Sequence, residues 1–289
     1  MSRSLDAASD ILRLMEHARA GNYVAASFFT LLVADYLQTF PQEVELVWFS
    51  KTSLVRAVYF MARYIGLILM TLNLVYLFDP GIVGDGCNKM YVVLMVVGTI
   101  NSISSEVLLY LQVWAISGNT VIAKCFLSFQ FLAILTVAGV SNHFILSGLQ
   151  PIDPVSSTPK CNPTVSLHWG SVIFTTLCVS QITLITITLL LAYRKYSGWK
   201  STLFLVFFRN GLIYWCLISV VYIAITVSAL RNLTGLYFLL AVPSSVFQSA
   251  LSTRSLLALR SSDHIASQDL SQLETMRFNS NVGTRDTQW

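Results

Sequence analysis

Charged residues are scarce in this chain. Only 11% of its 289 residues are Asp, Glu, Lys or Arg, whereas 55% are hydrophobic. An ordinary soluble domain carries about 25% charged residues. The N-terminus also lacks a short apolar core followed by a small-residue cleavage site, so we expect no cleaved signal peptide. The composition excludes a typical soluble globule and predicts a membrane protein.

Motifs for enzymatic chemistry are absent as well. The sequence has no Cys or His cluster with metal-ligand spacing, no nucleophile elbow and no phosphate-binding Gly motif. The last long apolar stretch contains no Lys, which excludes a retinal Schiff base there. We therefore expect a non-enzymatic protein that needs no cofactor or metal and has no nucleic-acid partner.

Hydrophobic residues gather in seven long stretches. Each approaches or exceeds the ~20 residues that a helix needs to cross a bilayer. Runs such as 182–191 are apolar on successive residues, which favours helices over the alternating strands of a barrel. We expect an all-α bundle of seven transmembrane helices over residues 22–259, with an extracellular tail (1–21) and a disordered cytosolic tail (260–289). The predicted spans are about 22–40, 54–78, 90–116, 121–147, 169–193, 203–229 and 235–257.

Basic residues predict the orientation of this bundle, because Lys and Arg concentrate in cytosolic loops. If the N-terminus is outside, the outer connections between spans contain only Lys89, Lys160 and Arg231 as basic residues. Three arginines before the first span argue for the opposite orientation. We expect the N-terminus outside and the C-terminus in the cytosol. Four basic residues are then candidate contacts for inner-leaflet lipid or a cytosolic partner: Lys51, Arg194, Lys195 and Lys200.

Two cysteines lie in the predicted outer loops. Cys87 precedes the third span and Cys161 lies between the fourth and fifth, so both face an oxidising compartment. This arrangement resembles the seven-helix receptors that couple to G proteins, and the resemblance implies a Cys87–Cys161 disulfide. The alternative is that two of five cysteines lie outside by chance. Asn232 begins an outer glycosylation sequon, which we expect to be unused so close to the membrane.

Other receptor motifs are missing. The Asp-Arg-Tyr motif at the end of the third helix is replaced by Leu111-Gln112-Val113-Trp114, and the seventh stretch has no Asn-Pro-x-x-Tyr motif. These departures argue against ordinary G-protein coupling.

A more specific resemblance lies near the first span. The residues that carry it are the string Asp35-Tyr36-Leu37-Gln38-Thr39-Phe40, followed by Glu43-Val44-Glu45, Trp48 and Lys51, and by Arg63-Tyr64 further along the chain. This pattern is similar to a family of multi-pass membrane proteins of mushroom-forming fungi, the domain-of-unknown-function 6533 family. The resemblance implies a seven-helix fungal membrane protein and no particular activity.

Four charged residues lie inside the predicted spans: Asp35, Arg63, Glu106 and Arg209. A charge at mid-bilayer costs at least ~2.5 kcal/mol, so such residues usually face the bundle interior with a partner. All four fall in the predicted cytosolic half, which suggests one buried layer with Asp35 paired to Arg63 and Glu106 to Arg209. The layer is either a switch between two conformations or a static polar layer that fixes the register of the helices.

Further polar residues are less specific. Gln181 and Gln248 are candidates for hydrogen bonds between helices. His143 is a candidate for lining a ligand pocket, or else an ordinary packing residue. Pro41 is expected to end the first helix, with Trp48 beyond it either as a membrane anchor or as part of a partner-facing elbow.

These features favour a receptor-like sensor of the plasma membrane with an unidentified extracellular ligand and a cytosolic signalling partner. A transporter of a small solute or protons that uses Glu106 and Arg209, and a structural membrane protein, are the alternatives.

Overall fold

The computed structural model describes residues 2–49, 53–79, 81–82, 85–117, 121–148, 167–196, 202–231, 237, 239–241 and 243–261, and these residues contain helices and short connections but no β-strand. The predicted all-α class is thus confirmed for this part of the chain. The elements are α1 (Ser2–Glu43), a π-helical turn η1 (Val44–Trp48), α2 (Leu54–Phe78), α3 (Asp85–Ser117), α4 (Val121–Ser147), α5 (Leu167–Tyr196) and α6 (Thr202–Leu230). Residues 243–261 form a further continuous helix, which we call the seventh helix.

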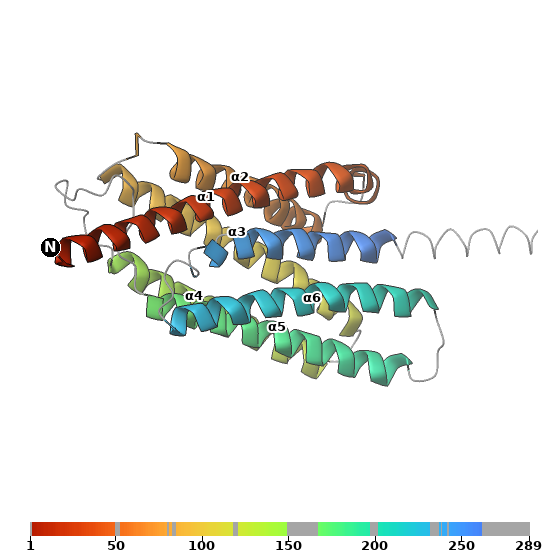
Figure 1. The fold of residues 1–289 in the computed structure, drawn as a ribbon. Coiled ribbons are helices and arrows are strands. Elements are labelled where there is room, and N and C mark those ends of the chain that lie inside the picture. Colours follow the sequence, from red (N-terminus) through yellow and green to blue (C-terminus); the bar gives the residue numbers. More distant parts are fainter. Residues whose placement is uncertain are drawn as a thin grey trace, which may run out of the picture.

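Within the described residues, six helices, α1 to α6, contain segments long and apolar enough to cross a membrane. The chain therefore has the architecture of a multi-pass membrane protein. Successive helices run in alternating directions, so the N-terminus of α1 and the last residues of the seventh helix lie at opposite ends of the bundle (Figure 1). We call the end that holds η1 the α1–α2 end.

The first helix differs from the prediction at Pro41. Pro41 lies inside α1, which continues to Glu43 and passes directly into η1. Proline removes one backbone donor, but its fixed φ is compatible with a helix, and here the chain widens into a π-helical turn instead of stopping. Residues 2–18, predicted as a separate tail, belong to the same helix. The next helix begins at a regular cap, because Ser53 Oγ accepts the backbone N–H of Arg56 at 3.4 Å.

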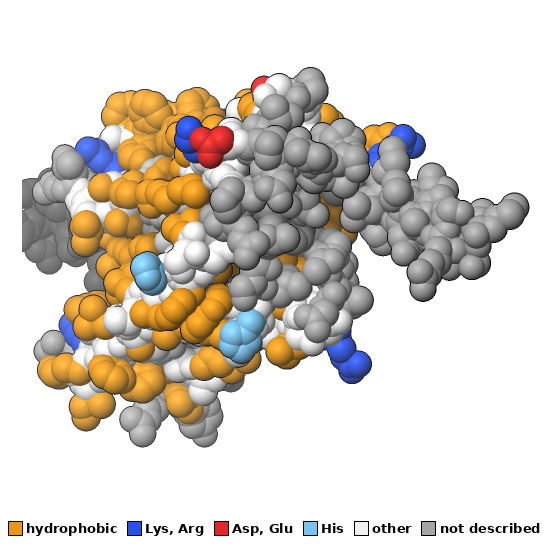
Figure 2. Space-filling model, turned by 90° about the vertical axis from the view of Figure 1, so that its left-hand side faces the viewer, with side chains coloured by type: hydrophobic (Ala, Val, Ile, Leu, Met, Phe, Trp, Pro, Cys, Tyr) orange, Lys and Arg blue, Asp and Glu red, His pale blue; other side chains and the backbone are white. Residues whose placement is uncertain are grey.

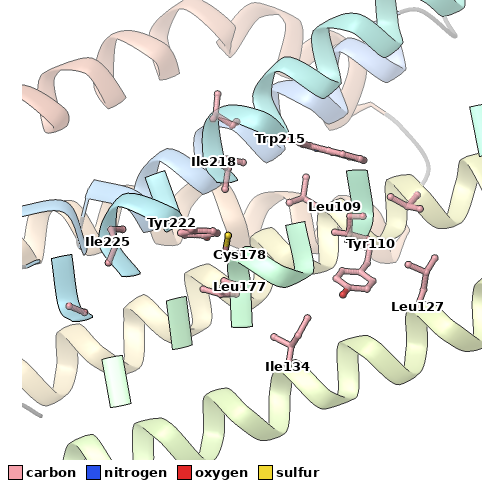
Figure 3. Packing of buried hydrophobic residues seen from close by; sticks show 14 of the residues in the cluster. Leu109, Tyr110, Leu127, Ile134, Leu177, Cys178, Trp215, Ile218, Tyr222 and Ile225 are labelled. Atoms are coloured by element: carbon pink, nitrogen blue, oxygen red, sulfur yellow. The ribbon is translucent and has the colours of Figure 1, made fainter. Parts of the chain in front are cut away.

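The bundle has two groups of helices. One group contains α1 and α2, and the other contains α4, α5 and α6, while α3 packs against members of both (Figure 1). A large apolar cluster fills the second group, with Leu109 of α3, Leu177 of α5 and Ile218 of α6 among its buried members (Figure 3). A smaller cluster joins α1, α2 and α3 through Leu32, Met70 and Leu94.

Exposed side chains are mostly apolar. Hydrophobic groups cover much of the described surface at one end of the molecule (Figure 2). Exposed hydrophobic residues of α4 include Ile122, Phe129 and Leu132, which are 87%, 73% and 62% exposed. A helix whose outward face is this apolar is suited to contact with lipid.

The seventh helix has the opposite character. Its buried face carries many polar residues beside Val246, Leu251, Leu256 and Leu257, and among the described residues it is not one of the six membrane-span candidates. The fully or nearly fully buried polar residues are Ser244, Gln248, Ser249, Ser252, Thr253 and Ser255. Buried polar groups require hydrogen-bond partners, and this helix has polar contacts with α1, α2 and α3.

Candidate functional site

Arg63 is the centre of a buried ionic cluster at the α1–α2 end. Its Nε lies 2.8 Å from Glu43 Oε2, and its Nη1 lies 3.6 Å from Asp35 Oδ2. Its other contacts are the Tyr36 carbonyl and the hydroxyls of Thr39 and Thr253. The guanidinium also stacks over the Tyr36 ring, 4.8 Å from the centroid. A planar group with five N–H donors can satisfy all of these partners at once.

The spacing of α1 explains how one helix supplies most of these contacts. Asp35, Thr39 and Glu43 are each four residues apart, so their side chains lie on one face of the helix. This face meets α2 where Arg63 points back toward α1. The acceptors are thus brought together by helical periodicity alone.

Arg254 joins the cluster from the seventh helix. Its Nε pairs with Asp35 Oδ1, and its Nη2 donates to Gln38 Oε1 at 3.2 Å. Asp35 therefore contacts two arginines. Glu43 is fully buried and contacts only Arg63 among the basic residues that the structure describes. We call these four residues, Asp35, Glu43, Arg63 and Arg254, the Arg63 cluster; its two acids and two bases balance in charge.

Aromatic side chains cover the Arg63 cluster. Trp48 Nε1 donates to Glu43 Oε1 at 3.2 Å, and the Tyr64 hydroxyl donates to the same oxygen at 3.3 Å. The Tyr36 hydroxyl in turn donates to Tyr64 at 2.9 Å. Phe40 and Phe60 pack edge-on against Trp48. The predicted membrane anchor Trp48 thus also binds a buried carboxylate, which keeps the charged groups away from the lipid-facing surface.

Glu106 is the centre of a second buried site. Its Oε1 accepts from Gln181 Nε2 of α5 at 2.7 Å and from Gln248 Nε2 of the seventh helix at 2.8 Å. Ser180 Oγ lies 3.5 Å from the other carboxylate oxygen and 3.1 Å from the Tyr110 hydroxyl. Glu106 is only 2% exposed. We call Glu106, Ser180, Gln181 and Gln248 the Glu106 cluster.

The two clusters lie at different depths along the seventh helix. Gln248 and Arg254 are six residues apart, which corresponds to about 9 Å along the axis. Between them, Ser249 Oγ donates to the Ala62 carbonyl of α2. Gly66 permits this approach, because a Cβ there would lie 3.1 Å from Ser249 Oγ and 3.3 Å from Asn101 Oδ1. Asp35, Arg63 and Glu106 were expected in one layer. In the structure Asp35 and Arg63 lie in one cluster and Glu106 in another, and the seventh helix contributes to both clusters.

The remaining predicted site residues are placed less completely. The Arg209 side chain lies outside the described residues, so its pairing with Glu106 stays a prediction. Cys87 is fully buried near the Tyr76 hydroxyl, but Cys161 lies outside the described part, and the disulfide also stays a prediction. His143 is exposed beside Phe144, with a centroid distance of 5.8 Å, and is not in the bundle interior.

The basic candidates for cytosolic contacts are only partly described. Arg194 and Lys195 lie at the end of α5, and their side chains are outside the described part. Lys51, Lys200 and the sequon residue Asn232 lie wholly outside the described residues, as does the tail after residue 261. Within the described residues, no three His, Cys, Asp or Glu side chains gather in a way suited to a metal ion.

Several site residues were not singled out as site residues by sequence reasoning. Glu43 was noted as part of the family pattern and Arg254 was not among the candidate site residues, whereas both belong to the Arg63 cluster. The four-residue spacing from Asp35 to Glu43 was the available signal for Glu43. Gln181 and Gln248 were expected to bond between helices, but nothing in the sequence indicated that both would meet on Glu106.

Comparison with known protein families gives a match near the first span. A model described as a family of unknown function (DUF6533) matches residues 23–68. This supports the resemblance seen in the sequence and covers the membrane part of α1, η1 and much of α2. Three of the four residues of the Arg63 cluster lie in the matched segment. No curated protein and no solved structure matches the chain significantly.

Proposed function

We propose that the protein is a non-enzymatic, receptor-like sensor of the plasma membrane that transmits a change to a cytosolic partner through its seventh helix. The Arg63 cluster carries this proposal. It ties the seventh helix to α1 and α2 at one end of the bundle, through Arg254 to Asp35 and through Arg63 to Thr253. A ligand would enter from outside, beneath the loop that carries Cys161.

The polar character of the seventh helix supports a switching role. Hydrogen bonds and ion pairs hold it on several sides, and such contacts have discrete alternative partners. Arg254 is 32% exposed in its side chain, whereas Arg63 is 4% exposed. Release of Arg254 therefore exposes less buried charge than release of Arg63, and the Arg254–Asp35 pair is the contact that we expect to open.

The predicted orientation of the bundle would put the Arg254–Asp35 pair on the side of the membrane where a cytosolic partner binds. Positive charge predicts that the α1–α2 end faces the cytosol. The basic residues Lys51, Arg194, Lys195 and Lys200 belong to the same predicted face. A shift of the seventh helix at this end would change the surface that they present.

Proximity labelling in intact cells tests the sensor proposal. A labelling enzyme is fused after residue 289 of the full chain, and the labelled cytosolic proteins are compared between wild type and Arg254→Gln at equal surface amounts. Arg231→Gln is the matched control, because Arg231 is exposed at the end of α6 and is predicted to lie outside. We expect Arg254→Gln, but not the control, to change the labelled set. Identical sets for all three proteins would contradict the sensor proposal, and a change only in protein amount would favour a structural role.

A transporter is the second candidate, favoured by one observation. Glu106 is a buried carboxylate with only neutral donors among its described contacts, as expected of a site that takes up a proton or solute. Uptake into proteoliposomes that is lost in Glu106→Gln would favour the transporter. A labelling change without solute uptake favours the sensor.

A further inference from the structure

The Glu106 cluster contains a carboxyl group with no basic group among its described neighbours. Gln181, Gln248 and Ser180 are neutral, and the ion pairs among the described residues all lie elsewhere. Hydrogen bonds from neutral donors reduce the cost of burying a carboxylate but leave its net charge unchanged. A site of this kind is suited to a bound positive charge.

Neighbours of the same carboxylate carry unpartnered oxygen atoms. Gln181 Oε1 and Gln248 Oε1 are fully buried and have no hydrogen-bond partner, although each belongs to an amide whose nitrogen binds Glu106. The Tyr222 hydroxyl of α6 is also buried without a partner and lies within electrostatic reach of Glu106. Figure 3 shows the Tyr222 ring beside Cys178, two residues before Ser180. Buried polar atoms without partners are rare, and each one needs an explanation.

The two amides can turn to present these oxygens. The oxygen and nitrogen of a Gln side chain are similar in size, and rotation about the last torsion exchanges their positions. The turned amides would place two oxygens where the nitrogens now lie, 2.7 and 2.8 Å from Glu106 Oε1. Oxygens at these separations repel one another, and a small outward movement of the two amides would leave room for a cation that all three oxygens ligate. Carboxylate and amide oxygens are the ligands that hard cations prefer.

Charge balance limits the kind of cation. Only one carboxylate is present in the Glu106 cluster, so one positive charge neutralises it. Dedicated calcium sites use several acidic ligands, and none of the other described Asp or Glu residues joins Glu106 in a metal-ligand group.

We propose that Glu106, Gln181 and Gln248 form a binding site for a small monovalent cation of the sodium type, which ties α3, α5 and the seventh helix together. This site lies about 9 Å along the seventh helix from Arg254, and it does not depend on the sensor proposal. Because the cation binds the folded bundle only, its binding stabilises that bundle.

Thermal unfolding of the purified full chain in lipid nanodiscs tests the site. The protein is compared in sodium chloride and in choline chloride at equal ionic strength and pH. At a sodium concentration about ten times the Kd we expect the Tm to rise by about 3–6 °C, with saturation on titration. In Glu106→Gln the sodium-dependent rise is expected to disappear. Glu45→Gln is the matched control, because Glu45 is an exposed carboxylate in η1, and it should keep the full rise.

Three results would overturn the proposal. One is a wild-type Tm that does not respond to sodium, as expected if Arg209 is the counter-ion of Glu106. Another is a sodium response that persists in Glu106→Gln. The third is a Tm that depends on pH through Glu106 but not on sodium, which would assign the site to a proton. A wild-type protein that does not respond overturns the proposal without any variant. If Glu106→Gln fails to fold, Gln248→Leu, which removes one proposed ligand, should lose the sodium-dependent rise, and a full rise in that variant would also overturn the proposal.

Discussion

The Arg63 cluster and the Glu106 cluster both place charged side chains among membrane helices, and they compensate the charge in different ways. Arg63 and Arg254 meet Asp35 and Glu43, so that the cluster balances within itself. Glu106 meets amides and a hydroxyl but no described basic group. The seventh helix contributes to both. The first cluster is thus organised by ion pairs, while the second is organised by hydrogen bonds around a single carboxylate.

This difference predicts how each cluster responds to the loss of one member. Removal of one partner from a buried ion pair leaves an uncompensated charge and costs about 3–5 kcal/mol. Replacement of a carboxylate that has only neutral donors leaves no buried charge behind. The two sites should therefore differ in mutational cost although they are similarly buried.

The largest effect is expected for Arg63→Leu. This change leaves Glu43 without a described basic partner and Asp35 with Arg254 alone, so the free energy of unfolding should fall by about 3–5 kcal/mol. Chemical unfolding in detergent micelles measures it. Arg254→Leu is the comparison, and its cost should be smaller because the Arg254 side chain is 32% exposed. Equal costs for the two variants would show that burial does not distinguish the two arginines.

A smaller effect is expected at the contact between the clusters. Gly66→Ala places a methyl group 3.1 Å from Ser249 Oγ, so the Ser249 side chain must shift by a few tenths of an ångström or the helices must adjust, at a cost of about 1–3 kcal/mol. Gly139→Ala is the matched control, because a Cβ on Gly139 of α4 meets nothing within 4 Å. Its unfolding free energy should stay level or rise slightly, since alanine favours the helix more than glycine does.

If Gly66→Ala proves as mild as the control, then α2 and the seventh helix are not held at the observed separation. The polar contact between Ser249 and the Ala62 carbonyl would then have little structural weight.

The helices were the most predictable part of this molecule. Long apolar runs define α2 and α4 almost to the residue, because a membrane helix must be apolar over its whole length. The boundary at Pro41 was wrong, since a proline near a helix end is tolerated when the following turn accommodates the missing donor. The seventh helix was read as a lipid-crossing stretch, and its polar face became interpretable only once its neighbours were known.

The site was less predictable, because charge composition does not specify contacts. Asp35 and Arg63 were expected to pair, and the structure places them 3.6 Å apart, yet the closer partner of Arg63 is Glu43. Glu43 lies beyond the first predicted span (22–40), so it was not among the charged residues sought inside the spans. The partners of Glu106 come from α5 and the seventh helix, 75 and 142 residues away along the chain. Contacts at such separations depend on packing that one sequence does not reveal.

The most direct test of the difference between the clusters compares the same substitution at Glu43 and at Glu106. Both carboxylates are buried, and both variants keep the side-chain shape. In sodium-free buffer, Glu43→Gln should lower the free energy of unfolding by about 3–5 kcal/mol, because one partner of the buried ion pair with Arg63 is lost. Glu106→Gln should lower it by less than about 1 kcal/mol, because the unpartnered oxygens of Gln181 and Gln248 can accept from the new amide. A cost at Glu106 equal to or greater than that at Glu43 would contradict the distinction between an ion-paired and an unpaired site.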